Sequence, residues 1–207
     1  MNGRVPLTRD FFLGDPRRVA PRLLNKLVVR GGLAGRIVEV EAYCGLDDPA
    51  SHAYRGKTRR NATMFGPPGH LYVYFSYGVH WCANAVCGPV GTGHAVLLRA
   101  LAPVSGIDEM WARRSGARRE QDLCSGPGKL CQALDLSRED DGADLVTGEG
   151  GVLIAADGRR PPARPGRGPR IGLSTAADHR WRWWVNGDVN VSRRAVPGRR
   201  GGGQSTP

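Results

Sequence analysis

Apolar and polar residues alternate strictly through residues 36–43, RIVEVEAY. Because successive side chains of a β-strand point to opposite faces of the sheet, this segment is expected to be a strand with two different faces. One face would be apolar, and the other would carry Glu39, Glu41 and Tyr43. The pattern predicts a strand that places two carboxylates side by side.

Residues 70–86, HLYVYFSYGVHWCANAV, contain two β-rich runs separated by Ser76-Tyr77-Gly78. Short strand-like runs around a glycine-containing break are typical of a β-hairpin. We therefore expect a hairpin with Tyr77 at or near its tip.

Other segments predict helices and further strands. Asp15-Pro16 is typical of a helix start, because Asp is a favoured N-cap and Pro is tolerated in the first turn, so a helix over 17–25 should follow. Ser105, with Asp108 three residues later, indicates a second helix start. The remaining predictions are helices over 106–114 and 127–136, and strands over 94–101, 181–185 and 189–191. Strands and helices mix without regular βαβ alternation, so the expected fold class is α+β.

Two long segments show no periodicity. Residues 44–69 are rich in Gly, Pro, Asp, Asn and Arg, and a loop of that length in a compact domain is usually functional or disordered. Residues 156–170 are typical of an Arg/Pro-rich insertion or exposed loop. We expect one domain over residues 1–195 and a disordered basic tail over 196–207.

The net charge of +11 suggests a polyanionic partner, usually nucleic acid. Most of it is confined to two stretches, because residues 158–170 hold five arginines and residues 193–207 hold four, with no acid in either. The charge indicates basic arms on a nearly balanced body, and arginine-rich composition alone would explain it equally well.

Several classes of protein are not expected. No apolar run reaches the roughly 18 residues of a membrane span, and the first ten residues do not resemble a signal peptide. The five cysteines contain no C-x-x-C pair, and the histidines lack the spacing of a known metal motif. We therefore expect an intracellular protein with reduced core or pocket-wall thiols and no bound metal.

All five tyrosines lie between positions 43 and 77. Tyrosine favours strands, which would explain the cluster, but Tyr43, Tyr72 and Tyr74 could also form an aromatic wall for a planar ligand. Tyr77, at a hairpin tip, would either pack against a neighbouring loop or act as a wedge that fills the space left by an extruded base.

The two glutamates also allow two interpretations. They are either structural acids in ion pairs or a catalytic carboxylate and its neighbour, where the catalytic group activates water beside a developing oxocarbenium ion. Periodicity does not choose between Glu39 and Glu41. His52, in the long polar loop, is a candidate hydrogen-bond donor to a ligand.

These segments together resemble the alkyladenine (3-methyladenine) DNA glycosylase family. The similarity runs almost continuously from Gly35 to Ala100 through GRIVEVEAY, DPASHAYRG, RNATMFGPPGHLYVYFSYGVHWCAN and AVLLRAL, and resumes in LCSGPGKLCQAL at residues 123–134. The quoted blocks hold 62 of the 207 residues, which is about 30% of the chain.

The resemblance assigns a role to individual residues. It implies that Glu41, followed by Ala-Tyr, is the water-activating carboxylate. It places base-stacking groups at Tyr43, His52 and Tyr74, and the intercalating residue at Tyr77. It implies that Asn84 disfavours the 2-amino group of undamaged guanine and that Arg99 lies beside the catalytic water.

The resemblance also implies a fold and an activity. The expected structure is a single compact α+β domain with a curved antiparallel sheet, surrounding helices and a projecting hairpin. The expected protein is a monomeric, cofactor-free, monofunctional glycosylase in the cytoplasm, associated with the nucleoid, that acts on alkylated or deaminated purines in double-stranded DNA. A non-catalytic nucleic-acid-binding module and a metal-dependent hydrolase are the alternatives.

Overall fold

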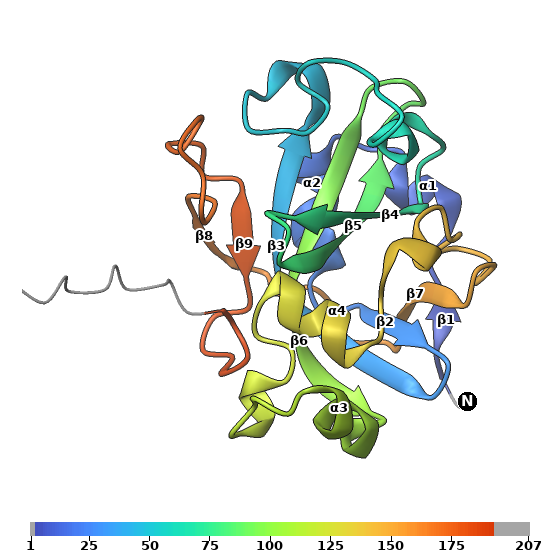
Figure 1. Cartoon of the computed structure of the whole chain (residues 1–207), viewed down its shortest axis with the longest axis vertical. Coiled ribbons are helices and arrows are strands. Elements are labelled where there is room, and N and C mark those ends of the chain that lie inside the picture. The colour runs from blue at the N-terminus through green and yellow to red at the C-terminus, as the bar shows by residue number, and fades with distance from the viewer. Residues whose placement is uncertain (1–2, 193–207) are drawn as a thin grey trace, which may run out of the picture.

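A computed structural model describes residues 3–192, and the predicted tail over 196–207 lies outside the described residues. The chain forms one α+β domain around a strongly curled antiparallel sheet (Figure 1). The order β1-β7-β2-β3-β6-β5-β4 defines the sheet, and β9 joins it at β3 and carries β8. The predicted fold class and curved antiparallel sheet are thereby confirmed.

The strands have the following bounds: β1 Val5–Pro6, β2 Leu27–Arg30, β3 Leu33–Cys44, β4 Leu71–Ser76, β5 His80–Cys87, β6 His94–Ser105, β7 Val152–Ala156, β8 Gly166–Gly168 and β9 Arg182–Trp184. Every pairing between them is antiparallel. The predicted strands at 36–43, 94–101 and 181–185 and both arms of the hairpin are therefore confirmed. The strand predicted over 189–191 is wrong, because these residues form turns outside any strand.

The α-helices are α1 Arg9–Phe12, α2 Pro16–Leu23, α3 Ile107–Arg113 and α4 Pro127–Ala133. The Asp15 carboxylate accepts a hydrogen bond from the Arg17 amide, which confirms the predicted start of α2. At α3 the predicted Ser105 cap is wrong, because Gly106 is the N-cap and no side chain caps this helix. Helix α2 packs against β3 and α4 packs against β5, on opposite sides of the sheet (Figure 1).

Strand β3 is the centre of the sheet and is paired along both edges. One edge pairs with β6, and the other pairs first with β2 and then with β9. Irregularities in the β3–β6 register between Ile37 and Val40 fall where the partner on the second edge changes. Glu39 and Glu41, in the part of β3 that pairs with β9, are both fully buried.

The apolar core has two parts. The larger cluster fills the space between the sheet and the helices; its largest fully buried members include Phe12, Leu23, Ile37, Leu98, Leu101, Met110 and Leu130. A smaller cluster of Ala53, Met64, Phe65, Tyr72, Val86 and Ala95 joins the polar loop to β4, β5 and β6. The loop over 44–69 is thus anchored, with short 3-10 turns at Gly45–Asp47 and Ala62–Phe65.

No helix within residues 3–192 is both long and apolar enough to cross a membrane.

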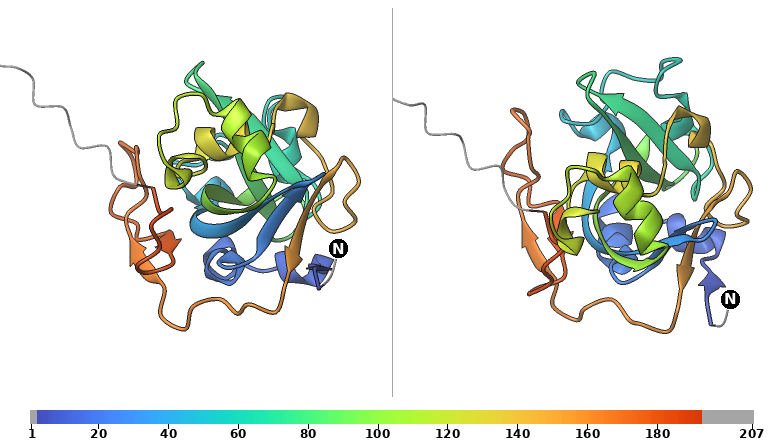
Figure 2. Two further views of the ribbon diagram at one scale, coloured as in Figure 1. Left: turned by 90° about the horizontal axis from the view of Figure 1, so that it is seen from below. Right: turned by 60° about the horizontal axis from the view of Figure 1, so that its bottom comes forward.

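The Arg/Pro-rich segment is only partly an exposed loop. It crosses the outside of the molecule from β7 to β8 (Figure 2), and Arg159 and Arg164 on it are exposed. Its C-terminal end, however, includes β8 and Arg170, whose side chain is fully buried. The prediction of an exposed insertion is therefore wrong for this end.

Arg170 is buried because it forms an ion pair with Asp48 in the polar loop. Its guanidinium nitrogens lie 2.5 and 2.8 Å from the two Asp48 carboxylate oxygens, and it also donates to the Ala42 carbonyl at 3.0 Å. Both side chains of the pair are inaccessible to solvent. Desolvated charges of this kind stabilise a fold only while both partners are present.

We predict that Arg170→Gln lowers the free energy of unfolding by about 3–5 kcal/mol, because it leaves Asp48 buried without its cation. Urea denaturation followed by circular dichroism measures the change. The matched control is Arg159→Gln, an exposed arginine of the same segment, which should change stability by less than about 0.5 kcal/mol. Equal stabilities for the two variants would contradict the structural role of the buried pair.

Candidate active site

Glu39 and Glu41 lie on β3 and are both fully buried. Glu39 is opposite Ala100 of β6 and Trp184 of β9, and Glu41 is opposite Leu97 and Arg182. An isolated buried carboxylate is strongly unfavourable, so each needs hydrogen-bond donors and positive charge nearby. The surroundings of the two carboxylates differ, and this difference separates them chemically.

Glu39 is surrounded by donors. Its Oε1 accepts from Arg182 at 2.8 Å and from the Nε of Arg99 at 3.2 Å, and its Oε2 accepts from the Ser192 amide at 2.7 Å. A carboxylate has about four acceptor positions, so Glu39 is nearly saturated. The arrangement is that of a structural acid held between two arginines.

Glu41 is bonded more sparsely. Its Oε1 accepts from the Ile171 amide at 2.8 Å, and its Oε2 accepts from the Tyr43 hydroxyl at 3.0 Å. Arg99 approaches Oε1 at 3.2 Å as an ion pair. With two hydrogen bonds, this carboxylate keeps acceptor capacity for a further polar atom.

The electrostatics of Glu41 suit a proton acceptor. Burial raises the pKa of its carboxyl above 4.5, while Arg99, the Ile171 amide and Tyr43 act in the opposite direction. Burial, followed by the charge of Glu41, raises the pKa of Tyr43 well above 10, so the phenol keeps its proton and donates it to the carboxylate. An ionised carboxylate with a raised pKa is a stronger base than an ordinary glutamate.

A cavity of about 600 Å³ opens beside this carboxylate. Six of the residues predicted for the site line it: Tyr43, His52, Tyr74, Tyr77, Asn84 and Arg99. Glu41 does not line the cavity, although its three neighbours Tyr43, Arg99 and Ile171 do. The carboxylate therefore lies directly behind the cavity wall.

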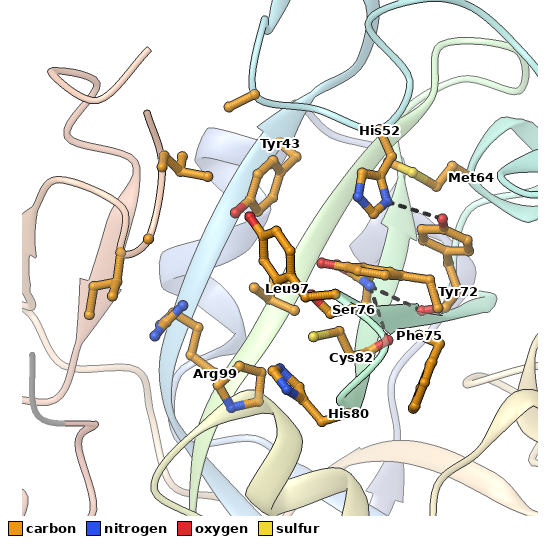
Figure 3. A pocket seen from close by; sticks show the side chains of 18 of the residues that line it. Tyr43, His52, Met64, Tyr72, Phe75, Ser76, His80, Cys82, Leu97 and Arg99 are labelled. Carbon is orange, nitrogen blue, oxygen red and sulfur yellow. Dashed lines mark hydrogen bonds between the residues drawn. The ribbon is translucent and has the colours of Figure 1, made fainter. Parts of the chain in front are cut away.

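Aromatic rings form the walls of the cavity. The His52 and Tyr74 rings meet edge to face with centroids 4.2 Å apart, and His52 Nδ1 lies 3.3 Å from the Tyr72 hydroxyl. Tyr43 faces His52 across the opening (Figure 3). The other side of the Tyr43 ring is covered by the Arg170 guanidinium at 4.6 Å, so the ring is held in place from behind.

His52 is held in a neutral form at neutral pH. Burial, with a smaller contribution from Arg60, lowers the pKa of its imidazole below 6.5. The Asn61 side chain fixes the loop here by donating to the His52 and Gly56 carbonyls at 2.8 and 3.1 Å. A neutral imidazole can approach a cationic ligand without charge repulsion.

Asn84 lies on β5 at the base of the cavity and is 4% exposed. Its side-chain nitrogen donates to the Tyr72 carbonyl at 3.1 Å and lies 3.5 Å from the Cys82 carbonyl. These contacts commit its N–H groups to the backbone of the hairpin. The amide oxygen is left as the group that a ligand can meet.

Tyr77 lies in the tight turn between β4 and β5 with 89% of its surface exposed. Tyr77 and Gly78 both have positive φ, 49° and 67°, and the Val79 amide donates to the Ser76 carbonyl at 2.9 Å. A turn of this kind favours Asn or Gly, and a tyrosine with positive φ is uncommon. Because Tyr77 is exposed, the alternative that it packs against a neighbouring loop is wrong.

The sequence patterns missed the residues that complete the site. Arg170, the Ile171 amide, Arg182 and Ser192 come from the C-terminal part of the chain, more than 120 residues from β3. Of these residues, only Arg182 lies in a predicted element, and no motif marks any of them as a site residue. A sequence signal was present only for β9 itself, in the run Trp181–Val185.

The cysteines and the metal-binding residue types add no separate centre. All five cysteines are free and buried, and Cys82 lines the cavity, as expected for core and pocket-wall thiols. Over residues 3–192 there is no group of three or more His, Cys, Asp or Glu side chains placed to hold a metal ion.

Comparison with known proteins shows which family this chain belongs to. The methylpurine-DNA glycosylase family model matches residues 10–189. Similar proteins named "Putative 3-methyladenine DNA glycosylase" occur in Burkholderia lata, 56% identical over 90% of both chains, and in Frankia casuarinae, 50% identical over 96% of this chain and 97% of the relative. One from Streptomyces avermitilis is 47% identical over 95% of this chain and 96% of its own length. The chain belongs to the methylpurine-DNA glycosylase family.

Proposed function

We propose that this protein is a monofunctional DNA glycosylase that, as a monomer, flips alkylated or deaminated purines out of duplex DNA and hydrolyses the N-glycosidic bond. The observation that carries the proposal is Glu41, a buried carboxylate with unused acceptor capacity, directly behind an aromatic cavity. The family match supports glycosylase chemistry on alkylated bases in DNA. The candidate lesions are 3-methyladenine, 7-methylguanine and hypoxanthine.

In the proposed reaction, Glu41 orients a water molecule and accepts its proton as the water attacks C1′. Its negative charge also stabilises the oxocarbenium character of the sugar. Arg99 holds Glu41 in place and keeps it ionised beside the attacking water. Burial lowers the pKa of Arg99, but Glu41 and Glu39 outweigh it and the net shift is upward, so the guanidinium stays charged.

The base would bind between Tyr43 on one side and His52 with Tyr74 on the other. Alkylation at N3 or N7 gives the purine a positive charge, which strengthens its attraction to aromatic rings and makes it a better leaving group. The lowered pKa of His52 keeps this wall neutral. Asn84 lines the cavity and would occupy the space that the 2-amino group of guanine needs, and so contribute to rejection of undamaged guanine.

Tyr77 would fill the gap that the flipped nucleotide leaves in the duplex. Extraction of a base costs a few kcal/mol, and an inserted side chain prevents its return. The exposed, positive-φ position of Tyr77 supports this role, because unfavourable backbone conformations at exposed turns are often retained for function.

A non-catalytic nucleic-acid-binding module fits the structure less well. Such a module needs the aromatic rings and the basic residues, but it has no use for two carboxylates buried behind the cavity, each requiring compensating arginines. Release of free base from alkylated DNA distinguishes the two functions.

We predict that Glu41→Gln reduces the single-turnover rate of base release from alkylated duplex by about 10²- to 10⁴-fold, because it removes the general base. Affinity for the lesion-containing duplex should change little. The control is Glu149→Gln, an exposed acid, which should retain wild-type activity. Near wild-type activity in Glu41→Gln would remove Glu41 from the reaction.

The rate should also depend on pH through Glu41. Its raised pKa means that the carboxylate form, which catalysis needs, is lost below a pH that lies above 4.5. Single-turnover release of 7-methylguanine between about pH 4 and pH 8, corrected for enzyme-free depurination, should therefore rise with pH to a plateau. A midpoint at or below the ordinary glutamate value would contradict this assignment.

We predict that Tyr77→Asn separates stability from activity. Asn tolerates positive φ, so the free energy of unfolding should stay constant or rise by up to about 1 kcal/mol. Excision from duplex DNA should nevertheless fall, while excision from a single-stranded oligonucleotide, which needs less unstacking, should fall less. Equal losses on both substrates would show that Tyr77 acts elsewhere than in base extraction.

A further inference from the structure

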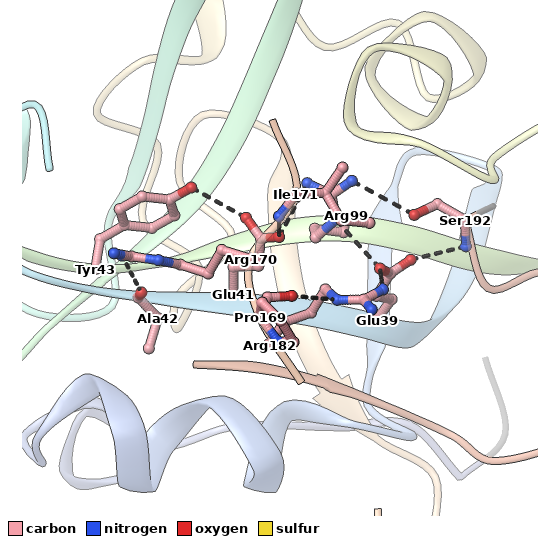
Figure 4. A network of polar contacts seen from close by, with 10 residues as sticks. All are labelled: Glu39, Glu41, Ala42, Tyr43, Arg99, Pro169, Arg170, Ile171, Arg182 and Ser192. Carbon is pink, nitrogen blue, oxygen red and sulfur yellow. Dashed lines mark hydrogen bonds and ion pairs between the residues drawn. The ribbon is translucent and has the colours of Figure 1, made fainter. Parts of the chain in front are cut away.

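One buried carboxylate near the cavity has no part in the proposed reaction. Glu39 lies between two arginines, Arg99 of β6 and Arg182 of β9, and only Arg99 also reaches Glu41 (Figure 4). The four side chains carry two positive and two negative charges, and all are nearly or fully buried. One arginine on each glutamate would neutralise the four charges equally well. Neutralisation alone therefore does not explain why Arg99 contacts both Glu39 and Glu41.

Three groups fix the Arg99 guanidinium. Its Nε donates to Glu39 at 3.2 Å, and its Nη2 donates to the Ser192 hydroxyl at 3.4 Å. Only Nη1 is directed to Glu41, where it makes an ion-pair contact at 3.2 Å with Oε1. Glu39 therefore prevents Arg99 from binding Glu41 through two parallel hydrogen bonds, the geometry that arginine and carboxylate prefer.

Glu39 is itself held from the C-terminal part of the chain. Arg182 donates to Glu39 at 2.8 Å and to the Pro169 carbonyl at 2.9 Å, and its guanidinium lies 4.4 Å from the Trp184 ring. The Ser192 amide donates to the second oxygen of Glu39 at 2.7 Å. The position of Glu39 is thus set from both edges of β3.

We propose that Glu39 is a positioning residue, which holds Arg99 on a single contact with Oε1 of Glu41 and so leaves Oε2, which accepts only from Tyr43, with an acceptor position for a proton from water. This inference rests on the proposed function of Glu41. Without the Glu39 carboxylate, Arg99 turns toward Glu41, pairs with both of its oxygens and occupies the acceptor position that the reaction needs.

The arrangement makes the pH dependence of the enzyme sensitive to Glu39. The charge of Glu39 raises the pKa of Glu41, in the same direction as burial. The other groups that face Glu41 are Arg99 from β6, the Ile171 amide, Tyr43, Arg170, and Tyr74 and Cys82 from β4 and β5. Removal of the Glu39 charge therefore lowers the pKa of Glu41, and the closer approach of Arg99 acts in the same direction.

The test is Glu39→Gln, which keeps the size of the side chain and one acceptor oxygen. On 7-methylguanine duplex, we expect the single-turnover rate at saturation to fall between about tenfold and a hundredfold. The Kd for the duplex should stay within about twofold, and the acid limb of the rate profile should move to lower pH. Glu39→Asp retains the charge, so its acid limb should stay where the wild-type limb lies.

A purely structural role for Glu39 predicts a different result. In that case Glu39→Gln would lower the melting temperature, while the folded fraction would keep the wild-type single-turnover rate, and the proposal would be overturned. If the single variant does not fold, Glu39→Gln with Arg182→Gln removes one charge of each sign and tests the same loss of rate. The single-turnover rate of this double variant should also fall by about tenfold or more, and a wild-type rate would overturn the proposal.

Glu41→Gln in the same assay separates the two proposals. If Glu41→Gln is inactive but Glu39→Gln keeps the wild-type rate, only the positioning role fails. If Glu41→Gln releases base at the wild-type rate, the proposed function of Glu41 fails.

Discussion

The burial of two carboxylates on a fully paired strand is the constraint from which the rest of this site follows. Ile171, Arg182 and Ser192 cover the face of β3 that carries Glu39 and Glu41, and neither carboxylate reaches water. Each unpaired buried charge would cost several kcal/mol, so β6 and β9 supply Arg99 and Arg182. The C-terminal segment is consequently part of the site and not an addition to a finished domain.

The same segment also holds the aromatic side of the site. Arg170 pairs with Asp48 of the polar loop and covers the back of Tyr43, while the next residue, Ile171, binds Glu41 through its amide. Two consecutive residues thus connect the loop that carries His52 with the strand that carries the carboxylate. This connection explains how a long loop rich in Gly and Pro can position a ligand-binding wall.

Rigid and unfavourable features are separated in the molecule. The carboxylates and their arginines lie in the sheet, where both glutamates are fully buried and both arginines are nearly so. The positive-φ conformation of Tyr77 lies in an exposed turn, where its cost is confined to one residue and does not disturb the core. Such an arrangement fits the proposed function, in which one element distorts DNA while another holds a reacting group still.

The sequence by itself determined the elements whose formation depends on residues close together along the chain. Strict alternation identified β3, the break at Ser76-Tyr77-Gly78 located the hairpin turn, and Asp15-Pro16 marked the start of α2. It could not show that Glu39 and Glu41 are buried, because alternation gives the face of a residue and not what covers that face. The family resemblance favoured Glu41, but only the tertiary structure showed that Glu39 accepts three hydrogen bonds while Glu41 accepts two. That difference arises from Ile171, Arg182 and Ser192, which lie more than 120 residues away, and a local pattern carries no information about contacts made at such a separation.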